Sequence, residues 1–257
     1  MSLLEIRQFM CLDDNFGVLA HDPKSGATLT VDVPDADAVA RELDKAGWKL
    51  THILITHHHA DHTQGLKALK AKTGAHVIGP VKSASRFPEF DQNVGDGDTV
   101  RFGAYDICCI ATPGHTLDQI SYWLPEAEVA FTGDTLFAMG CGRIFEGTPE
   151  MMWASLEKLV TMLPPQTAIY CGHEYTLANA RFAVTVDPAN SALADRLAEV
   201  ETLREAGKPT LPTTMALEKQ TNPFLRARDP GVQEAVGLIG APADEVFAEV
   251  RHRKDTF

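Results

Sequence analysis

The densest group of possible metal ligands in the chain is the segment 56–62, with the sequence THHHADH. It directly follows the apolar run 53–55, which we predict to be a strand. Side chains two positions apart on an extended segment point to the same side, so His57 and His59 should converge while His58 points away. Imidazole is a common ligand of divalent transition metals, so this spacing favours a metal site.

Two more potential ligands, Asp61 and His62, follow at the turn before a predicted amphipathic helix over 64–72. They would be aimed in a different direction from His57 and His59. This layout suits two neighbouring metal ions better than one.

Three later apolar stretches also end in a histidine or an aspartate. These residues are His115 after Tyr105–Ala111, Asp134 after Val129–Phe131, and His173 after the apolar stretch that begins at Ile169. Gly133 lets the backbone approach closely next to Asp134. Catalytic zinc commonly takes three protein ligands and keeps a position open for water, so these strand ends complete a plausible catalytic centre.

The order of these motifs resembles that of the metallo-β-lactamase superfamily: His-x-His-x-Asp-His, then Gly-His, Gly-Asp and Gly-His. Within that superfamily, the segments 140–148 and 171–176 resemble the glyoxalase II (hydroxyacylglutathione hydrolase) family. The segments 222–226 and 251–257 resemble the same family. The resemblance runs from about Asp14 to the last residue.

The resemblance implies two divalent metal ions per chain, held by imidazoles and carboxylates. The first ion would be held by His57, His59 and His115, the second by Asp61, His62 and His173, and Asp134 would bridge the two. We expect zinc, with iron or manganese as alternatives in one or both sites. A metal-bridging hydroxide, held by Asp134 and Asp61, would be the nucleophile.

The implied reaction is hydrolysis of S-(2-hydroxyacyl)glutathione, with S-D-lactoylglutathione giving D-lactate and glutathione in methylglyoxal detoxification. The thiolate leaving group needs little protonation, because free thiols titrate near pH 8.5. The implied substrate contacts are Arg143, Tyr175, Arg251 and Lys254. Arg and Lys suit the two carboxylates of glutathione.

The chain departs from the family pattern at a few positions. It has Arg143 and Phe145 where some members carry Lys and Tyr, and Asp118-Gln119 where Gly-His is more usual. A carboxylate at Asp118 would weaken the affinity for an anionic substrate. Asp32 is open to two interpretations: it orients a ligand imidazole, or it is an ordinary carboxylate at the end of a strand.

The main alternative function is a mononuclear-iron dioxygenase of the same superfamily that acts on glutathione persulfide. Such an enzyme does not need the complete second metal site. A lactamase or lactonase would not explain the basic C-terminal end, and a non-catalytic metal protein would not need an open coordination position. The complete ligand set favours hydrolysis.

Short apolar strands alternate with helices up to about Tyr170, which is typical of α/β layers. The predicted strands are Ala27–Val33, His52–Ile55, His76–Ile78, Tyr105–Ala111, Gln119–Leu124 and Glu128–Phe131. The predicted helices are Asp35–Ala46, Gln64–Lys72, Pro149–Met162, Ala194–Ala206 and Ala243–Arg253. We expect Lys208–Pro223 to be an extended arm. The resemblance implies a four-layered αβ/βα sandwich, so we expect a catalytic domain over 1–174 and a smaller α-helical, glutathione-thioester-binding domain over 175–257.

Composition restricts the partners and the compartment. A net charge of −12 argues against nucleic acid, which usually meets a basic surface. No segment approaches the length of a membrane span, and the N-terminus lacks the pattern of a secretory signal. The five cysteines form no evident disulfide framework. We therefore expect a cytoplasmic protein with free thiols, and on family grounds a monomer.

Overall fold

The computed structural model describes residues 4–257. The chain forms two compact units by its internal contacts. Unit 1 comprises the described residues up to 111 together with 118–133, and unit 2 comprises 112–117 and 134–257.

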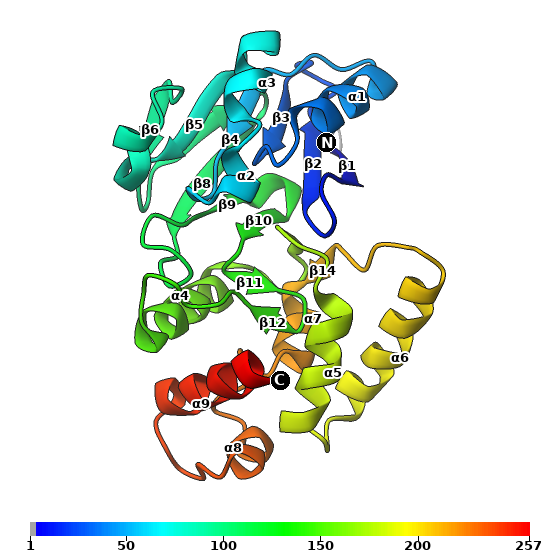
Figure 1. The fold of residues 1–257 in the computed structure, drawn as a ribbon, viewed down its shortest axis with the longest axis vertical. Helices are drawn as coiled ribbons and strands as arrows, with labels where there is room; N and C mark the ends of the chain where they lie inside the picture. Colours follow the sequence, from blue (N-terminus) through cyan, green and yellow to red (C-terminus); the bar gives the residue numbers. More distant parts are fainter. Residues whose placement is uncertain (1–3) are drawn as a thin grey trace. The chain divides into compact units, whose positions relative to one another are not determined.

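Unit 1 contains a mixed sheet in the order β1-β2-β3-β4-β5-β6 (Figure 1). Its strands are β1 (Glu5–Met10), β2 (Phe16–His21), β3 (Thr28–Val31), β4 (His52–Leu54), β5 (His76–Pro80) and β6 (Gln92–Val94). The first three strands pair antiparallel, whereas β3 to β6 run parallel. The parallel strands end at one edge of the sheet, and the loops that follow β3 and β4 at this edge carry possible ligands.

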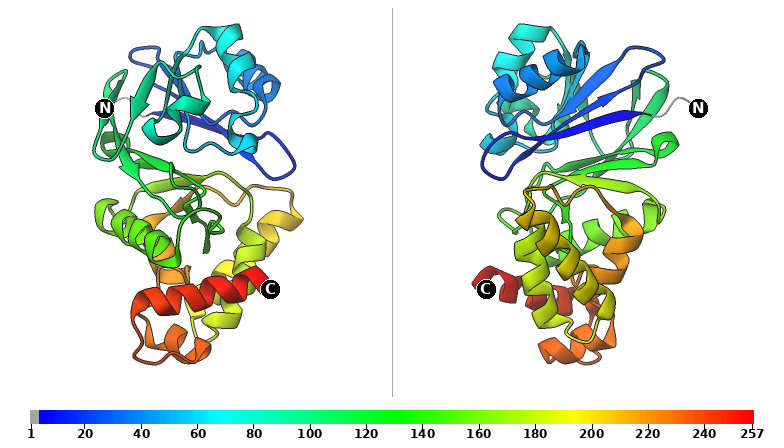
Figure 2. Two further views of the ribbon diagram at one scale, coloured as in Figure 1. Left: turned by 60° about the vertical axis from the view of Figure 1, so that its left-hand side comes forward. Right: turned by 90° about the vertical axis from the view of Figure 1, so that its right-hand side faces the viewer.

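Helices α1 (Ala36–Ala46) and α3 (Leu66–Thr73) cover one face of this sheet (Figure 2). Asp35 caps α1 by accepting a hydrogen bond from the backbone of Asp37, and Gly47 ends it in the left-handed conformation. The apolar residues of both helices pack onto the alternating inward residues of the strands. The short helices α2 (Ala60–Thr63) and η1 (Val81–Arg86) follow β4 and β5.

A second, antiparallel sheet in unit 1 joins β7 (Thr99–Phe102), β8 (Tyr105–Ala111), β9 (Ile120–Leu124) and β10 (Val129–Gly133), with the short helix η2 (Pro125–Ala127) between the last two. It packs against the first sheet. The Tyr122 hydroxyl donates to the Ile55 carbonyl at 2.6 Å. The ring of His52 meets that of Phe102 edge to face at 5.5 Å. Tyr122 and Phe102 are fully buried, so this interface is part of the core.

Unit 2 combines two small antiparallel strand pairs with helices. The elements are β11 (Leu136–Phe137), β12 (Gly140–Cys141), α4 (Pro149–Met162), β13 (Ala168–Cys171), α5 (Thr176–Val186), α6 (Ser191–Glu205), β14 (Thr213–Thr214), α7 (Met215–Thr221), α8 (Pro230–Val236) and α9 (Ala243–Thr256). Helices α5 and α6 pack side by side as a hairpin, and α4 packs against α9 through Trp153 and Phe247.

Most predicted elements are confirmed, and two of them, β8 and α4, have the predicted bounds to the residue. The prediction of an extended arm over Lys208–Pro223 is wrong, because this segment contains β14 and α7. Thr214 caps α7 by accepting a hydrogen bond from the backbone of Leu217, and the helix-forming residues that follow outweigh the flanking prolines.

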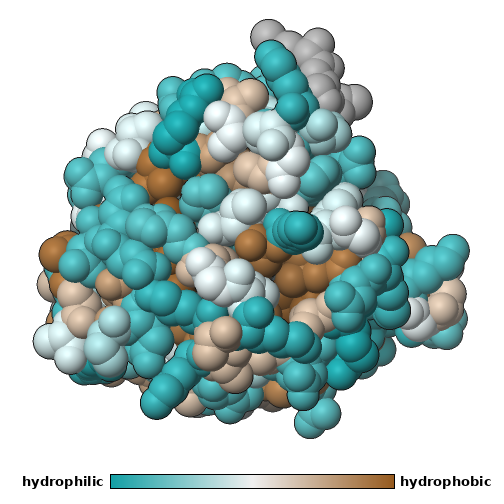
Figure 3. Space-filling view, turned by 90° about the horizontal axis from the view of Figure 1, so that it is seen from above, coloured by the Kyte–Doolittle hydropathy of each residue, from teal (hydrophilic) through white to brown (hydrophobic). Residues whose placement is uncertain are grey.

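The space-filling view is mostly hydrophilic, with a central area of apolar side chains (Figure 3). Among residues 4–257, the helices are all too short or too polar to span a bilayer.

Candidate metal centre

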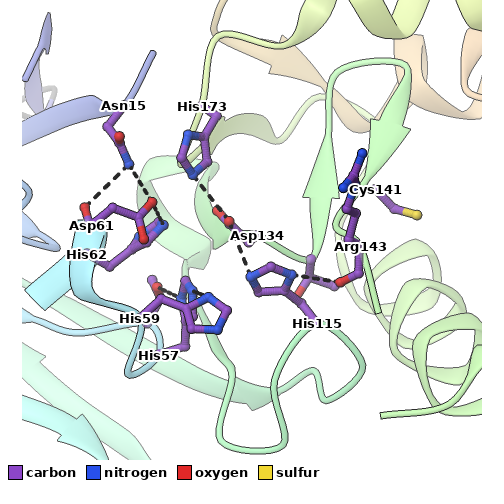
Figure 4. A network of polar contacts seen from close by, with 12 residues as sticks. Asn15, His57, His59, Asp61, His62, His115, Asp134, Cys141, Arg143 and His173 are labelled. Carbon is purple, nitrogen blue, oxygen red and sulfur yellow. Dashed lines mark hydrogen bonds and ion pairs between the residues drawn. The ribbon is translucent and has the colours of Figure 1, made fainter. Parts of the chain in front are cut away.

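In unit 1, His57 and His59 converge as predicted. Nε2 of His57 lies 3.1 Å from Nδ1 of His59 (Figure 4). His57 is fully buried and the ring of His62 lies 4.2 Å away, centroid to centroid. His58 points elsewhere and contacts Asp118. The extended backbone before α2 therefore separates the three consecutive imidazoles as its two-residue period requires.

Asp32 orients two of these imidazoles, His62 directly and His57 through Thr56, which favours the first of its two interpretations. Its Oδ2 accepts a hydrogen bond from Nδ1 of His62 at 2.7 Å and from the Thr56 hydroxyl at 2.8 Å. Because that hydroxyl already donates to Asp32, its oxygen accepts from Nδ1 of His57 at 2.9 Å. Protons on both Nδ1 atoms leave the Nε2 atoms as the basic ones, which is how a carboxylate prepares an imidazole for a metal.

Asp61 is held by Asn15, the residue directly before β2. The side-chain amide of Asn15 donates to Oδ2 of Asp61 at 3.0 Å and to its backbone carbonyl at 3.3 Å (Figure 4). Oδ2 of Asp61 also lies 3.5 Å from Nε2 of His62. The two side chains, which lie in α2, therefore turn their ligand atoms toward each other.

In unit 2, Asp134 lies between two imidazoles. Its Oδ2 is 3.5 Å from Nε2 of His115 and 3.3 Å from Nε2 of His173 (Figure 4). Nδ1 of His115 donates to the Arg143 carbonyl at 2.7 Å, which again leaves Nε2 as the basic nitrogen. All three side chains are buried.

The donor atoms in both units fit divalent metal ions. Ligand bonds of about 2.0–2.2 Å in tetrahedral geometry place two ligand atoms roughly 3.3–3.5 Å apart. The ligand-atom separations within unit 1 and within unit 2 fall near this range, between 3.1 and 3.5 Å. Imidazole and carboxylate donors of this kind bind zinc, iron and manganese, so the clusters support divalent metal binding.

The predicted substrate-binding cations gather around one carboxylate in unit 2. Oδ1 of Asp255 lies 2.7 Å from Arg251 and 3.7 Å from Arg143. The Arg143 side chain is 63% exposed, whereas Arg251 is buried and donates to the Cys141 carbonyl at 3.0 Å. Burial, together with repulsion from Arg251 and Arg143, lowers the pKa of Lys254 to about 8.

Aromatic rings flank the ligands of unit 2. Tyr175 stacks on His173 with a centroid distance of 4.7 Å and nearly parallel planes, and its edge meets Phe137. Phe145 lies against His115 at 5.2 Å and is largely exposed. The Tyr175 hydroxyl can hydrogen-bond to a polar substrate, whereas Phe145 offers only an apolar edge.

Sequence reasoning missed several supporting groups. These are the amide of Asn15, the hydroxyl of Thr56 and the backbone carbonyl of Arg143. Each belongs to a residue type that is common on the surface, and only the folded contacts single it out. Cys141 lies buried in β12.

Comparisons with known proteins identify the fold. Residues 26–108 and 109–173 match the model of the metallo-β-lactamase superfamily. A structure described as ETHE1 from Myxococcus xanthus covers 98% of this chain and all of its own, with a TM-score of 0.67 and 28% identity. A B3 metallo-β-lactamase, BLEG-1, covers 86% with a TM-score of 0.65 and 20% identity. The chain has the metallo-β-lactamase fold, an α/β fold, followed by a helical C-terminal part.

The finer relationship comes from the C-terminal part and from full-length relatives. Residues 174–257 match the model of the hydroxyacylglutathione hydrolase C-terminus. Hydroxyacylglutathione hydrolases of Brucella anthropi and Brucella ovis are 56% and 55% identical over 254 residues, which is 99% of this chain and 97% and 98% of theirs. The chain belongs to the hydroxyacylglutathione hydrolase family.

Proposed function

We propose that the protein hydrolyses the thioester of S-(2-hydroxyacyl)glutathione, releasing a 2-hydroxy acid and glutathione. The observation that carries this proposal is the near-full-length similarity to hydroxyacylglutathione hydrolases, together with intact donor sets in both units. This similarity favours an enzyme of the thioester hydrolase type over the dioxygenase alternative, because the ETHE1 structure is only 28% identical. S-D-lactoylglutathione is the proposed substrate, which would place the enzyme in methylglyoxal detoxification.

We propose two metal ions per chain, with the family's ligand assignment. His57, His59 and His115 would hold one ion, Asp61, His62 and His173 the other, and Asp134 both. The contacts of Asp134 support this role, because one of its oxygens faces an imidazole from each of the two proposed sets. Zinc is the proposed metal, and iron or manganese in one or both sites would satisfy the same donors. When bound, two such ions supply a hydroxide near neutral pH and offset the negative charge that develops on the thioester oxygen.

The chain's own groups prepare the ligands and hold the substrate. Asp32 and the Arg143 carbonyl keep the ligand imidazoles in the tautomer with a basic Nε2. The exposed Arg143 guanidinium and Lys254 would bind the glutathione carboxylates. Arg251 would act through Asp255, which it shares with Arg143, and Tyr175 would offer its hydroxyl to the peptide.

No strong general acid is required for the leaving group. A thiol titrates near pH 8.5, so glutathione can leave as the thiolate. An amide would need protonation of its nitrogen. The residues assigned to the site therefore suit a thioester better than an amide.

The proposed function also implies an oligomeric state, partners and a cellular compartment. We propose a monomer that acts on a small glutathione thioester, with neither nucleic acid nor a membrane as its partner. The cytoplasm is the proposed compartment, in keeping with cysteine usage that shows no disulfide framework in the sequence.

The test is hydrolysis of S-D-lactoylglutathione by metal-replete protein, measured as the loss of thioester absorbance. We expect kcat/KM of at least about 10⁴ M⁻¹ s⁻¹ and two metal ions per chain. His173→Ala should lose one ion and most of the activity, whereas His252→Ala, at an exposed histidine in α9, should keep both. Oxygen uptake with glutathione persulfide and one iron per chain would instead establish the dioxygenase.

A further inference from the structure

The segment that carries His57 and His59 rests on the start of β9. Three contacts join this segment to alternating residues of the chain: Asp118, which precedes the strand, and Ile120 and Tyr122 within it. The Tyr122 hydroxyl donates to the Ile55 carbonyl at 2.6 Å, and the Ile120 backbone N–H donates to the Thr56 carbonyl at 2.9 Å. Asp118 makes the third contact, with His58.

The Asp118–His58 contact is partly buried and directional. Oδ1 of Asp118 accepts a hydrogen bond from Nδ1 of His58 at 2.9 Å. The two side chains are only 6% and 14% exposed. A charge-assisted hydrogen bond in such surroundings is stronger than one in water and fixes the rotamer of the ring.

His58 lies between two proposed metal ligands, so the backbone conformation at residue 58 sets the directions of the His57 and His59 side chains. The backbone bonds of Thr56 and the ring of His58 hold the segment at both ends of the short stretch that presents His57. Rotation of the peptide at residue 58 would turn His57 and His59 away from a common point, because they depend on the extended backbone to face the same side.

We propose that Asp118 is a positioning residue for the metal ligands: by holding His58, it keeps His57 and His59 directed at the same ion. This inference rests on the proposed metal centre. It also gives Asp118, a departure from the family's usual glycine, a role. The carboxylate is buried against His58 and is therefore not presented to an anionic substrate.

The experiment is an equilibrium competition between the metal-replete protein and a chromophoric zinc chelator, with thermal unfolding measured in parallel. We expect Asp118→Gly and His58→Ala each to weaken zinc binding by about 10-fold to 100-fold, as loss of an orienting partner does. Asp118→Asn, whose amide oxygen still accepts the hydrogen bond, should stay within about 3-fold of the wild type. The double variant Asp118→Gly/His58→Ala should be no weaker than the weaker single variant, because the two residues act through one contact.

Asp22→Ala is the matched control. Asp22 is also a buried carboxylate of unit 1, and it accepts hydrogen bonds from Ser25 and from the backbones of Lys24 and Ala104. The Asp22→Ala substitution should lower the melting temperature and leave zinc affinity unchanged. The inference would be overturned if Asp118→Gly kept the zinc affinity of the wild type, or if Asp118→Asn or Asp22→Ala lost as much zinc affinity as Asp118→Gly. Additive losses of zinc affinity in the double variant would also overturn it. A wild-type protein that holds no zinc, iron or manganese would instead overturn the proposed function.

Discussion

Asp32 controls two proposed ligand imidazoles with one carboxylate. We expect Asp32→Ala to weaken metal binding by about 100-fold or more, because His62 loses its acceptor and the Thr56 hydroxyl no longer fixes His57. The metal affinity of Asp32→Asn should lie between those of the wild type and Asp32→Ala. Asn tolerates the positive φ of 56° at this position, so its backbone adds little strain. Chelator competition measures the effect, and unchanged affinity in Asp32→Ala would remove Asp32 from the centre.

We expect Lys254, a proposed substrate contact, to give substrate binding a pH dependence. Its pKa is lowered to about 8, first by burial and then by Arg251 and Arg143. Lys254 is therefore charged below pH 8 and mostly neutral at pH 9, so its attraction for a carboxylate is lost as the pH rises. We expect KM for the glutathione thioester to rise several-fold between pH 7 and pH 9. The Lys254→Arg variant should remove this rise, because Arg stays charged. An identical pH profile in that variant would show that another group titrates.

The proposed ligand residues could be predicted from the sequence because metal coordination needs rare residue types at fixed spacing. The contacts that support them could not. Asn15 and Asp61 are 46 positions apart, and Asp118 and His58 are 60 apart. Nothing local in either pair of sequences marks them as partners, and each contact exists only because folding brings these distant segments, which lie outside the strands, together.

At the scale of elements, Gly133 ends β10 directly before Asp134 with φ of 48°. A Cβ there would lie 2.4 Å from the Gln119 amide and 2.9 Å from Thr56. We expect Gly133→Ala to displace Asp134 and to lower both stability and metal affinity. Gly26→Ala has a similar positive φ in open space, so it should cost only about 1 kcal/mol and leave metal binding intact. Denaturant unfolding and metal content separate the two variants. Equal effects would mean that backbone strain alone matters.

Helix α7 was missed because prolines at 212 and 223 flank it and threonines precede it. Its Glu218 makes contacts that local sequence cannot show. The fully buried carboxylate accepts hydrogen bonds from the Met139 backbone, Thr213 and Asn222, and lies 3.7 Å from Arg196. Burial raises the pKa of Glu218, and these partners oppose that shift.

We expect Glu218→Ala to destabilise the protein by about 3 kcal/mol or more, because Arg196 is left buried without its carboxylate. The exposed Glu199→Ala on α6 should stay within about 0.5 kcal/mol of the wild type. Urea unfolding provides the free energies. A small effect at Glu218 would mean that water or a rearranged side chain replaces the carboxylate.

At the scale of the whole molecule, metal binding should contribute to stability. An ion present at about 1,000 times its dissociation constant adds roughly 4 kcal/mol to the folded state. For a chain of 257 residues this corresponds to a melting temperature about 10 °C higher. We expect a chelator to lower the melting temperature by this order and zinc to restore it. The same melting temperature with and without chelator would contradict the proposed centre.

The α/β class could be predicted because apolar strands alternate with helices along the sequence, and the resemblance carried by the order of the motifs implied the layered sandwich. The division into compact units did not follow from the sequence. Residues 112–117 group with unit 2 and 118–133 with unit 1, so the chain passes between the units more than once. Composition changes only gradually along that stretch and gives no boundary signal. The catalytic and substrate-binding domains over 1–174 and 175–257 remain a proposal about function.

The bond from the Met139 backbone to Glu218 spans 79 positions of the chain. Met139 has a φ of 52° in the turn between β11 and β12, and Asn222 donates to the carbonyls of Phe137 and Gly140 on either side. A fragment that stopped at residue 174 would leave these peptide groups without their partners. The C-terminal helices thus stabilise the loop that starts at Asp134, and we expect a fragment that ends at residue 174 not to keep this loop in its native conformation.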